Sequence, residues 1–413
     1  MNGFVMREKR EVVFYTLTLI GLSLSLLFTR SLAYLPAILG LVAALLYWNP
    51  VRSQIRPILP IIVIGSAFLL LGALSSLWSS HPEIVYDRVL KTSLIFYPSC
   101  LLLAFVHAQR QHVDFGKLLV GVFIGWSIAA LIVAIEQVNG FYLYRLVRGI
   151  PAEDIVHGSV SNWNVMAICA VGWWLIYGMF KKQLFRARSR WMMLVVISAL
   201  SLFNLVFTWN QTIQMGMILA LIAMLVPFYK KRSVWYVMCA LVAASIFLAP
   251  WIASWVYSYI EVENGFSPNW FLKQAAAGPR LEIWAFISES ILERPILGYG
   301  MEMTRYSEFN APLLLFKSNT VLHPHNIALQ LWIEFGVFGA MLGFGAISYC
   351  LLKIHQLVKT RLDLMILGGF LIQFSAVLTG YGLWQGWLLG LSMLALAGWS
   401  LFFPPEDRRL KTL

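Results

Sequence analysis

Residues 58–78 read ILPIIVIGSAFLLLGALSSLW, a run of 21 residues without one charged side chain. A helix rises about 1.5 Å per residue, so this run is long enough to cross the roughly 30 Å hydrocarbon core of a bilayer. The composition of the whole 413-residue chain also favours a membrane protein, because 60% of its residues are hydrophobic and only 12% are charged. Soluble proteins carry about 25% charged residues. The sequence therefore predicts a membrane-spanning protein and excludes a soluble globular one.

Further apolar runs lie along the rest of the chain. Backbone groups inside a bilayer must bond within their own segment, which favours helices over open strands. We therefore predict an all-α polytopic membrane protein, a single integral membrane domain over 1–413 with about twelve spans. The predicted spans lie near 12–29, 32–48, 58–78, 93–107, 117–136, 163–180, 191–208, 211–229, 233–255, 326–352, 363–380 and 384–403. The fourth is the shortest, and Tyr97-Pro98 interrupts it.

The basic residues predict how the spans are oriented. Twenty-one of the 31 lysines and arginines fall in loops on one side, which the bias of cytoplasmic loops toward positive charge makes the cytoplasmic side. Both termini lie on that side, with the first span as an uncleaved anchor. The formal charge of +12 is therefore mostly a topology signal and predicts no nucleic-acid partner. The other ten basic residues lie on the translocated side, where chemistry is expected: Arg30, Arg88, Lys91, Arg145, Arg148, Lys273, Arg280, Arg294, Arg305 and Lys317.

Two translocated segments, 137–162 and 256–325, are too long to be simple turns, and loops of this length are usually functional or disordered. The second is predicted to form a subdomain with short helices between spans nine and ten. Within it, Gly278-Pro279 and Arg294-Pro295 frame a predicted helix over 280–293. Trp284, Ile287 and Ile291 follow helical spacing. The alternative is an interfacial amphipathic helix without chemistry.

The sequence His323-Pro324-His325-Asn326 ends this loop and opens the tenth span. At helical spacing His325 shares a face with Leu329, Trp332, Gly336 and Gly339, and the glycines are expected to let another helix approach. The partial positive charge of a helix N-terminus disfavours imidazolium, which would keep His325 a neutral base. The alternatives are a boundary histidine without a role and a metal site with His323. Besides His81, only His157 could join such a metal site, and no aspartate cluster accompanies it, so no metal is expected.

The spacing His325-Asn326-x9-Gly336-x2-Gly339, after a long loop that carries Arg280, resembles the O-antigen ligase family. Leu77-Trp78-Ser79, before a polar loop with Pro82, is similar too. The resemblance implies a GT-C-type glycosyltransferase of the Gram-negative inner membrane with a periplasmic active site and no cofactor. Such an enzyme moves O-antigen polysaccharide from undecaprenyl diphosphate to lipid A–core oligosaccharide in lipopolysaccharide biosynthesis.

The resemblance also assigns roles. His325 would be the catalytic base, and Arg280 would hold the donor phosphate. The family usually has a further arginine at the start of the eighth span, but residues 209–214 read WNQTIQ. The predicted substitutes that bind substrate are Arg145 and Arg148, then Arg88 and Lys91. Asn326, next to the histidine, is assigned to substrate binding with them.

Other functions stay open. An O-antigen polymerase would use the same donor, but no glycine follows Arg145, Arg148, Arg280, Arg294 or Arg305 after ten intervening residues, as polymerases often have. A protein O-oligosaccharyltransferase is expected to carry a longer soluble tail. A transporter or lipid flippase is expected to carry charge near the bilayer midplane. The main such charge here is Glu334, for which Gln330 and Gln373 are the expected partners.

Overall fold

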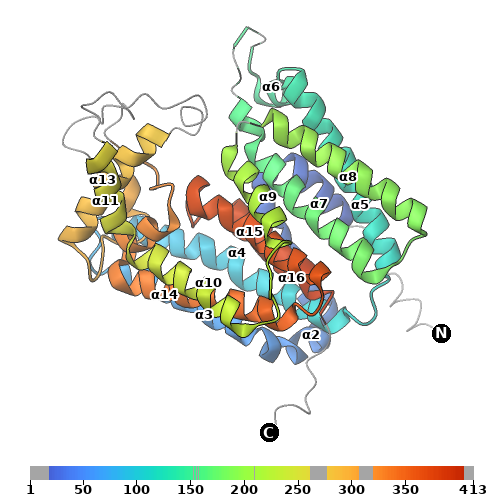
Figure 1. Cartoon of the computed structure of the whole chain (residues 1–413), viewed down its shortest axis with the longest axis horizontal. Coiled ribbons are helices and arrows are strands. Elements are labelled where there is room, and N and C mark those ends of the chain that lie inside the picture. Colours follow the sequence, from blue (N-terminus) through green and yellow to red (C-terminus); the bar gives the residue numbers. More distant parts are fainter. Residues whose placement is uncertain are drawn as a thin grey trace, which may run out of the picture.

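The computed structural model describes residues 18–151, 153, 154, 156, 158–208, 210–260, 277–306 and 320–403. The elements in these ranges are helical (Figure 1). Eight segments are long and apolar enough to cross a membrane. They are α2 (Leu35–Ser53), α3 (Ile55–Ser75), α4 (Pro82–Gln109), α5 (Phe115–Val138), α7 (Asn162–Lys182, preceded by η2, Gly158–Ser161), α8 (Ala187–Phe207), α14 (Ile327–Leu357) and α15 (Leu364–Ser375, between η5, Arg361–Asp363, and the π-helical turn η6, Ala376–Gly380).

Four further predicted spans correspond to broken or shorter helices. α10 (Arg232–Phe247) and α11 (Ala249–Ile260) form one bent unit with an angle of 62°. Three apolar helices are shorter than a full crossing: Thr18–Leu27, α9 (Gln211–Ala223) and α16 (Gly386–Ser400). The chain is thus a multi-pass membrane protein, and the number of twelve crossings stays a prediction.

The fourth span differs from its prediction. The sequence predicts a short run over 93–107, but α4 has 28 residues and continues through Pro98. Proline at the first turn is compatible with a helix, and Pro82 begins this one. The backbone of α2 passes close to Pro98, where a Cβ at Gly40 would collide with the Pro98 carbonyl. The interruption is therefore accommodated by a close helix contact and does not end the span.

The helices form two groups joined by a third (Figure 1). In the first, α4 packs between α2 and α3, and α14 packs on α3 and α10. In the second, α5, α7 and α8 pack side by side. α16 contacts α4 and α7, and α15 contacts α7 and α14, so these helices connect the groups. Buried apolar side chains such as Trp126, Tyr177 and Phe335 fill the interior.

The tenth span is broken at Gly336, which has φ 59° and ψ −145°. The segment after α13 (Ala277–Glu293) binds the backbone groups that the break exposes: Val337 N–H donates to Pro295 O at 2.9 Å, and Tyr299 N–H donates to Ile333 O at 2.8 Å. The expectation that both glycines admit another helix was therefore wrong for Gly336, whose neighbour is this loop. A Cβ at Gly339 would meet the carbonyl of Leu331 on the same helix, so Gly339 accommodates the bend itself.

The two translocated segments contain helices, as predicted for the second. α11 extends five residues past the predicted end of the ninth span, and α13 and η4 (Met303–Tyr306) follow it. In the first segment α6 (Tyr142–Arg148) and η2 lie between α5 and α7. The predicted helix over 280–293 is confirmed as α13, which begins three residues earlier.

Candidate functional site

His325 is held by η6, the π-helical turn that follows α15. Its Nδ1 atom lies 2.8 Å from the carbonyl oxygen of Gly380, the last residue of η6. The final carbonyls of a helix have no partner within it, so this oxygen is free to accept a hydrogen bond. A carbonyl can only accept, so Nδ1 carries the proton and Nε2 of the neutral ring keeps its lone pair. His325 itself has φ 54°, a left-handed conformation that its neighbours must stabilise.

Asn326 helps to hold the backbone of His325 in this conformation. Its side-chain oxygen accepts from Ala328 N–H at 2.9 Å and from Leu329 N–H at 3.3 Å, and so caps α14. The amide predicted to bind substrate therefore positions the histidine beside it. His323 adds a second contact, because its Nδ1 accepts from the His325 N–H at 3.3 Å. The two imidazole rings lie 4.2 Å apart between centroids.

Both histidines are neutral at physiological pH. Burial and the Arg280 guanidinium lower the pKa of His325 to about 4, while the Gly380 carbonyl acts against them. Burial, His325, Arg305 and Arg280 lower the pKa of His323 to about 3. A neutral His325 agrees with the sequence prediction, but burial and a nearby cation are its main causes, rather than the helix N-terminus.

Arg280 comes within electrostatic range of His325 because α13 is fastened to the histidine segment. The indole N–H of Trp284, one turn after Arg280, donates to the Pro324 carbonyl at 2.8 Å. On the same helix Ile283, Ile287 and Ile291 are at most 1% exposed. The helix is thus packed into the protein, contrary to the alternative of an interfacial helix. Sequence reasoning treated Trp284 as part of an apolar stripe and missed this contact.

A second cationic cluster, which includes Arg305, lies within electrostatic range of His323. Glu302 forms ion pairs with Arg305 at 2.7 Å and with Arg88 at 2.9 Å. Arg88 also donates to the Trp384 carbonyl at 3.3 Å. The network joins Arg88, one of the predicted substrate-binding residues, to the region of the histidines.

The network continues to the buried Glu334. This carboxyl group is 1% exposed and accepts from Gln330 at 2.9 Å and from Trp384 at 2.6 Å. Gln330 was one of its expected partners, and Trp384 is a partner that the sequence did not predict. Both carboxylate oxygens of Glu334 are thus hydrogen-bonded to side chains in the packed interior, as expected for a residue with a structural role.

An aromatic cluster links the site to Arg30. Tyr381 follows Gly380, accepts a hydrogen bond from Asn210 at 2.9 Å and lies within electrostatic range of Arg280. The Tyr381 and Trp163 ring centroids are 6.3 Å apart, and the Arg30 guanidinium lies 5.8 Å above Trp163. Arg30 is exposed, and no carboxylate of the described ranges forms an ion pair with it.

Arg30 is one of the ten translocated cations, but it stands in no motif that predicts a role for it. Its signal was its position, immediately after the first span, which carries no information about distant Trp163. Asn210 stands in the stretch that lacks the family's arginine, and its contact with Tyr381 brings that stretch to the same cluster.

The structure does not bring Arg145 and Arg148 to His325. Both lie on α6, which packs on α5 in the second helix group and is well separated from α13 in Figure 1. Arg145 donates to Gly140 O and Pro151 O at 2.8 and 2.7 Å, and Arg148 lies over the Tyr144 ring. Lys91 pairs with Asp87 at 2.7 Å on an exposed surface. Of the four predicted substitute cations, only Arg88 is connected to the histidine region.

The described residues also form no cluster of metal ligands at this site. In the part of the chain that the structure describes, no three side chains of His, Cys, Asp or Glu gather where they could hold a metal ion. His157, considered with His323, lies outside the described residues. The arrangement that the described residues do provide is a neutral base beside guanidinium groups, which suits proton removal next to an anionic substrate.

Comparison with known proteins agrees with this chemistry. A sequence model described as O-antigen ligase matches residues 196–344, a range that contains both Arg280 and His325. The match supports an O-antigen ligase family assignment. For this family the matches indicate a ligase or polymerase type of function.

The relatives are proteins described as candidate polysaccharide ligases. The protein of Rickettsia conorii is 26% identical over 40% of this chain and 41% of its own length. That of Rickettsia felis is 25% identical over 44% and 46% of the two lengths, and that of Rickettsia bellii 24% identical over 64% and 60%. The chain thus spans less than two thirds of each of these relatives.

Proposed function

We propose that this O-antigen ligase family member transfers O-antigen polysaccharide from undecaprenyl diphosphate to lipid A–core oligosaccharide at the periplasmic face of a Gram-negative inner membrane. The observation that carries the proposal is the approach of a neutral His325, oriented by Gly380, to Arg280. A glycosyl transfer from a lipid diphosphate needs a proton acceptor for the incoming hydroxyl group and positive charge for the departing diphosphate.

His325 would remove the proton. As the acceptor hydroxyl oxygen forms its bond to the anomeric carbon of the donor glycan, its proton passes to Nε2 of His325. The bond between that carbon and the diphosphate oxygen breaks at the same centre, and the electron pair leaves with the diphosphate. The Nδ1–H bond to Gly380 keeps Nε2 turned toward the reaction and stabilises the imidazolium that forms.

The donor would itself adjust the basicity of His325. In the free protein the pKa of about 4 makes the imidazole a weak base. A bound diphosphate brings negative charge beside Arg280 and offsets the cation that lowers this pKa. Donor binding is therefore expected to raise the pKa of His325 toward the working pH, so that the base becomes strong only when the substrate is present.

Arg280 and Arg30 would hold the donor diphosphate. Arginine binds phosphate oxygens through two parallel N–H donors, and two guanidinium groups can share one diphosphate. Within the described ranges no carboxylate pairs with either residue, whereas Arg88 and Arg305 are already bonded to Glu302. The donor-binding role assigned from sequence to Arg145, Arg148 and Lys91 thus passes to Arg30 in this proposal.

The test is transfer with purified protein, a glycan linked to undecaprenyl diphosphate, and lipid A–core. A ladder of glycan on lipid A–core is the result that a ligase gives. Growth of the lipid-linked glycan without the ladder would instead assign the protein as a polymerase. Activity is expected to persist in chelator, and a loss that a divalent ion restores would overturn the metal-independent mechanism.

A further inference from the structure

A cavity of about 850 Å³ lies between the two helix groups, at the end of the molecule opposite His325. Ligand sites in proteins usually have volumes of about 300–1,000 Å³. It is lined by the last turns of α2 and α4, the first turns of α5 and the middle of α7, so it faces the loops predicted to be cytoplasmic. It belongs to neither the histidine site nor its network.

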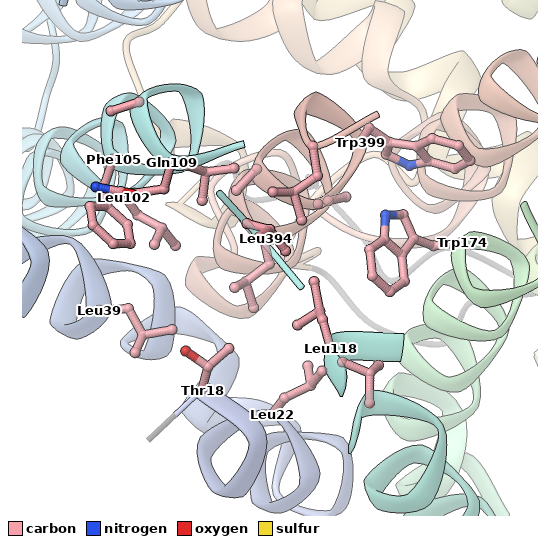
Figure 2. A pocket seen from close by; sticks show the side chains of 18 of the residues that line it. Thr18, Leu22, Leu39, Leu102, Phe105, Gln109, Leu118, Trp174, Leu394 and Trp399 are labelled. Carbon is pink, nitrogen blue, oxygen red and sulfur yellow. The ribbon is translucent and has the colours of Figure 1, made fainter. Parts of the chain in front are cut away.

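The wall of the cavity is apolar. Figure 2 shows Leu22, Leu102, Leu118 and Leu394 with Phe105 around the space, on helices of both groups. α16 contacts α4 on one side and α7 on the other, so its side chains close the space from a third direction. Such a wall favours hydrocarbon over water.

One polar group in this wall lacks a partner. Trp174 is 9% exposed and lines the cavity, and among the described residues its indole N–H has no hydrogen-bond partner. A buried N–H normally finds an acceptor, and an indole N–H can only donate. The cavity is therefore suited to a ligand that brings an acceptor oxygen into an otherwise apolar space.

The rim is polar and surrounded by cations. Ser53, Gln54, Gln109 and His112 line the open end. Exposed basic side chains stand beside these positions on the neighbouring helix ends, namely Arg52, Arg56, Lys117 and Lys182. Lys182 is held over the Phe115 ring, with Nζ 4.0 Å from its centroid. Clustered cations at a membrane surface attract anionic lipid headgroups.

We propose that this cavity binds one anionic glycerophospholipid from the membrane leaflet at that end of the molecule. An acyl chain lies against the leucine side chains, an ester carbonyl accepts the Trp174 N–H, and the phosphate faces the basic rim. The lipid joins the two helix groups where they are connected mainly through α16. The proposal stands on the cavity alone and does not depend on the proposed glycan transfer.

Native mass spectrometry of the full chain tests it. The delipidated protein in detergent is exposed to equal amounts of phosphatidylglycerol and phosphatidylcholine with distinguishable acyl masses. We expect one tightly retained phosphatidylglycerol. Ala395→Trp fills the cavity from α16 and should reduce retention about tenfold, whereas Leu396→Trp, on the exposed side of the same helix, should retain the lipid as wild type does.

Two further variants test the Trp174 hydrogen bond and the basic rim separately. Trp174→Phe should weaken retention of both lipids, because it removes the N–H and keeps the ring. Arg52→Glu combined with Lys117→Glu should remove the preference for phosphatidylglycerol. Equal retention in Ala395→Trp and Leu396→Trp, equal retention of the two lipids by wild type, or a polyprenyl phosphate as the molecule that copurifies would each overturn the proposal.

Discussion

The Nδ1 atom of His325 donates to the carbonyl oxygen of Gly380 at 2.8 Å. The two residues are 55 positions apart, on different spans, and the π-helical turn at the end of α15 places the carbonyl. This contact fixes the tautomer, leaves Nε2 as the acceptor and holds the imidazole beside Arg280. The predictions below follow from that arrangement.

The pH dependence of transfer should show the low pKa of His325. The base must be unprotonated, so activity is lost as the pH falls through its pKa. The profile of kcat/KM reports the free protein, and its acid limb should lie near pH 4, well below the 6.5 of an ordinary histidine. Arg280 is the charged group that acts on this ring, and the neighbouring imidazole is that of His323, on which Arg305 acts in turn. Arg280→Gln removes a nearby cation and should move the limb to higher pH. An acid limb at 6.5 in both proteins would contradict the environment described here.

Arg280 should act through the shape of its guanidinium group. Charge-assisted hydrogen bonds are worth about 1.5–3 kcal/mol, so Arg280→Ala should lower kcat/KM for the lipid-linked donor by about 10–100-fold. Arg280→Lys keeps the charge but loses the paired donors, and its loss should be smaller. Donor kinetics at fixed acceptor concentration provide the measurement. Equal activity of the two variants would rule out a phosphate clamp at this position.

Arg30 should matter more than the arginines of α6. Arg30→Ala should reduce donor use about tenfold, because it removes a cation that Trp163 holds near Tyr381 and Arg280. Arg148→Ala is the matched control, since that side chain rests on Tyr144 on α6, away from α13. Donor titrations compare the two. The opposite order of effects would return the donor site to the first long loop.

The break in α14 should be essential for folding. Gly336→Ala puts a side chain at φ 59° against the carbonyl of Ile296, and backbone strain alone costs about 1–3 kcal/mol. We expect a clearly lowered melting temperature and poor yield. Gly345→Ala on the same helix meets nothing within 4 Å and should melt like wild type. Equal melting temperatures for the two variants would show that the break is not required.

Much of the fold could be predicted from the sequence, because a bilayer imposes simple rules of length and hydropathy on each span. The twelve predicted runs correspond to eight long helices, one bent pair and three shorter helices among the described residues. The predicted helix ends and breaks were wrong where a segment distant in the sequence packs against the helix. Proline does not end α4 because α2 packs against it, and Gly336 breaks α14 because residues 295–300 bind the exposed backbone.

The site was predictable to the extent that its residues lie in one motif. His325 and Arg280 were selected from the loop and the start of its following helix, and the structure brings them together. Gly380, Tyr381 and Trp163 were not predictable, because they contribute a carbonyl and two rings from other spans without a sequence signal. Arg145 and Arg148 were selected for their loop position, and only the packing of α6 on α5 reveals that they lie apart.

The central claim is that His325 removes the acceptor proton, and replacing it tests that claim most directly. Glycan transfer to lipid A–core is measured with purified wild type, His325→Ala and His355→Ala, a histidine control in the last turn of α14, at the other end of the helix that His325 precedes. General-base catalysis contributes about 10²–10⁴-fold, so His325→Ala should lose at least that factor while it melts like wild type and His355→Ala stays active. A folded His325→Ala protein that produces the glycan ladder at the wild-type rate would contradict the account.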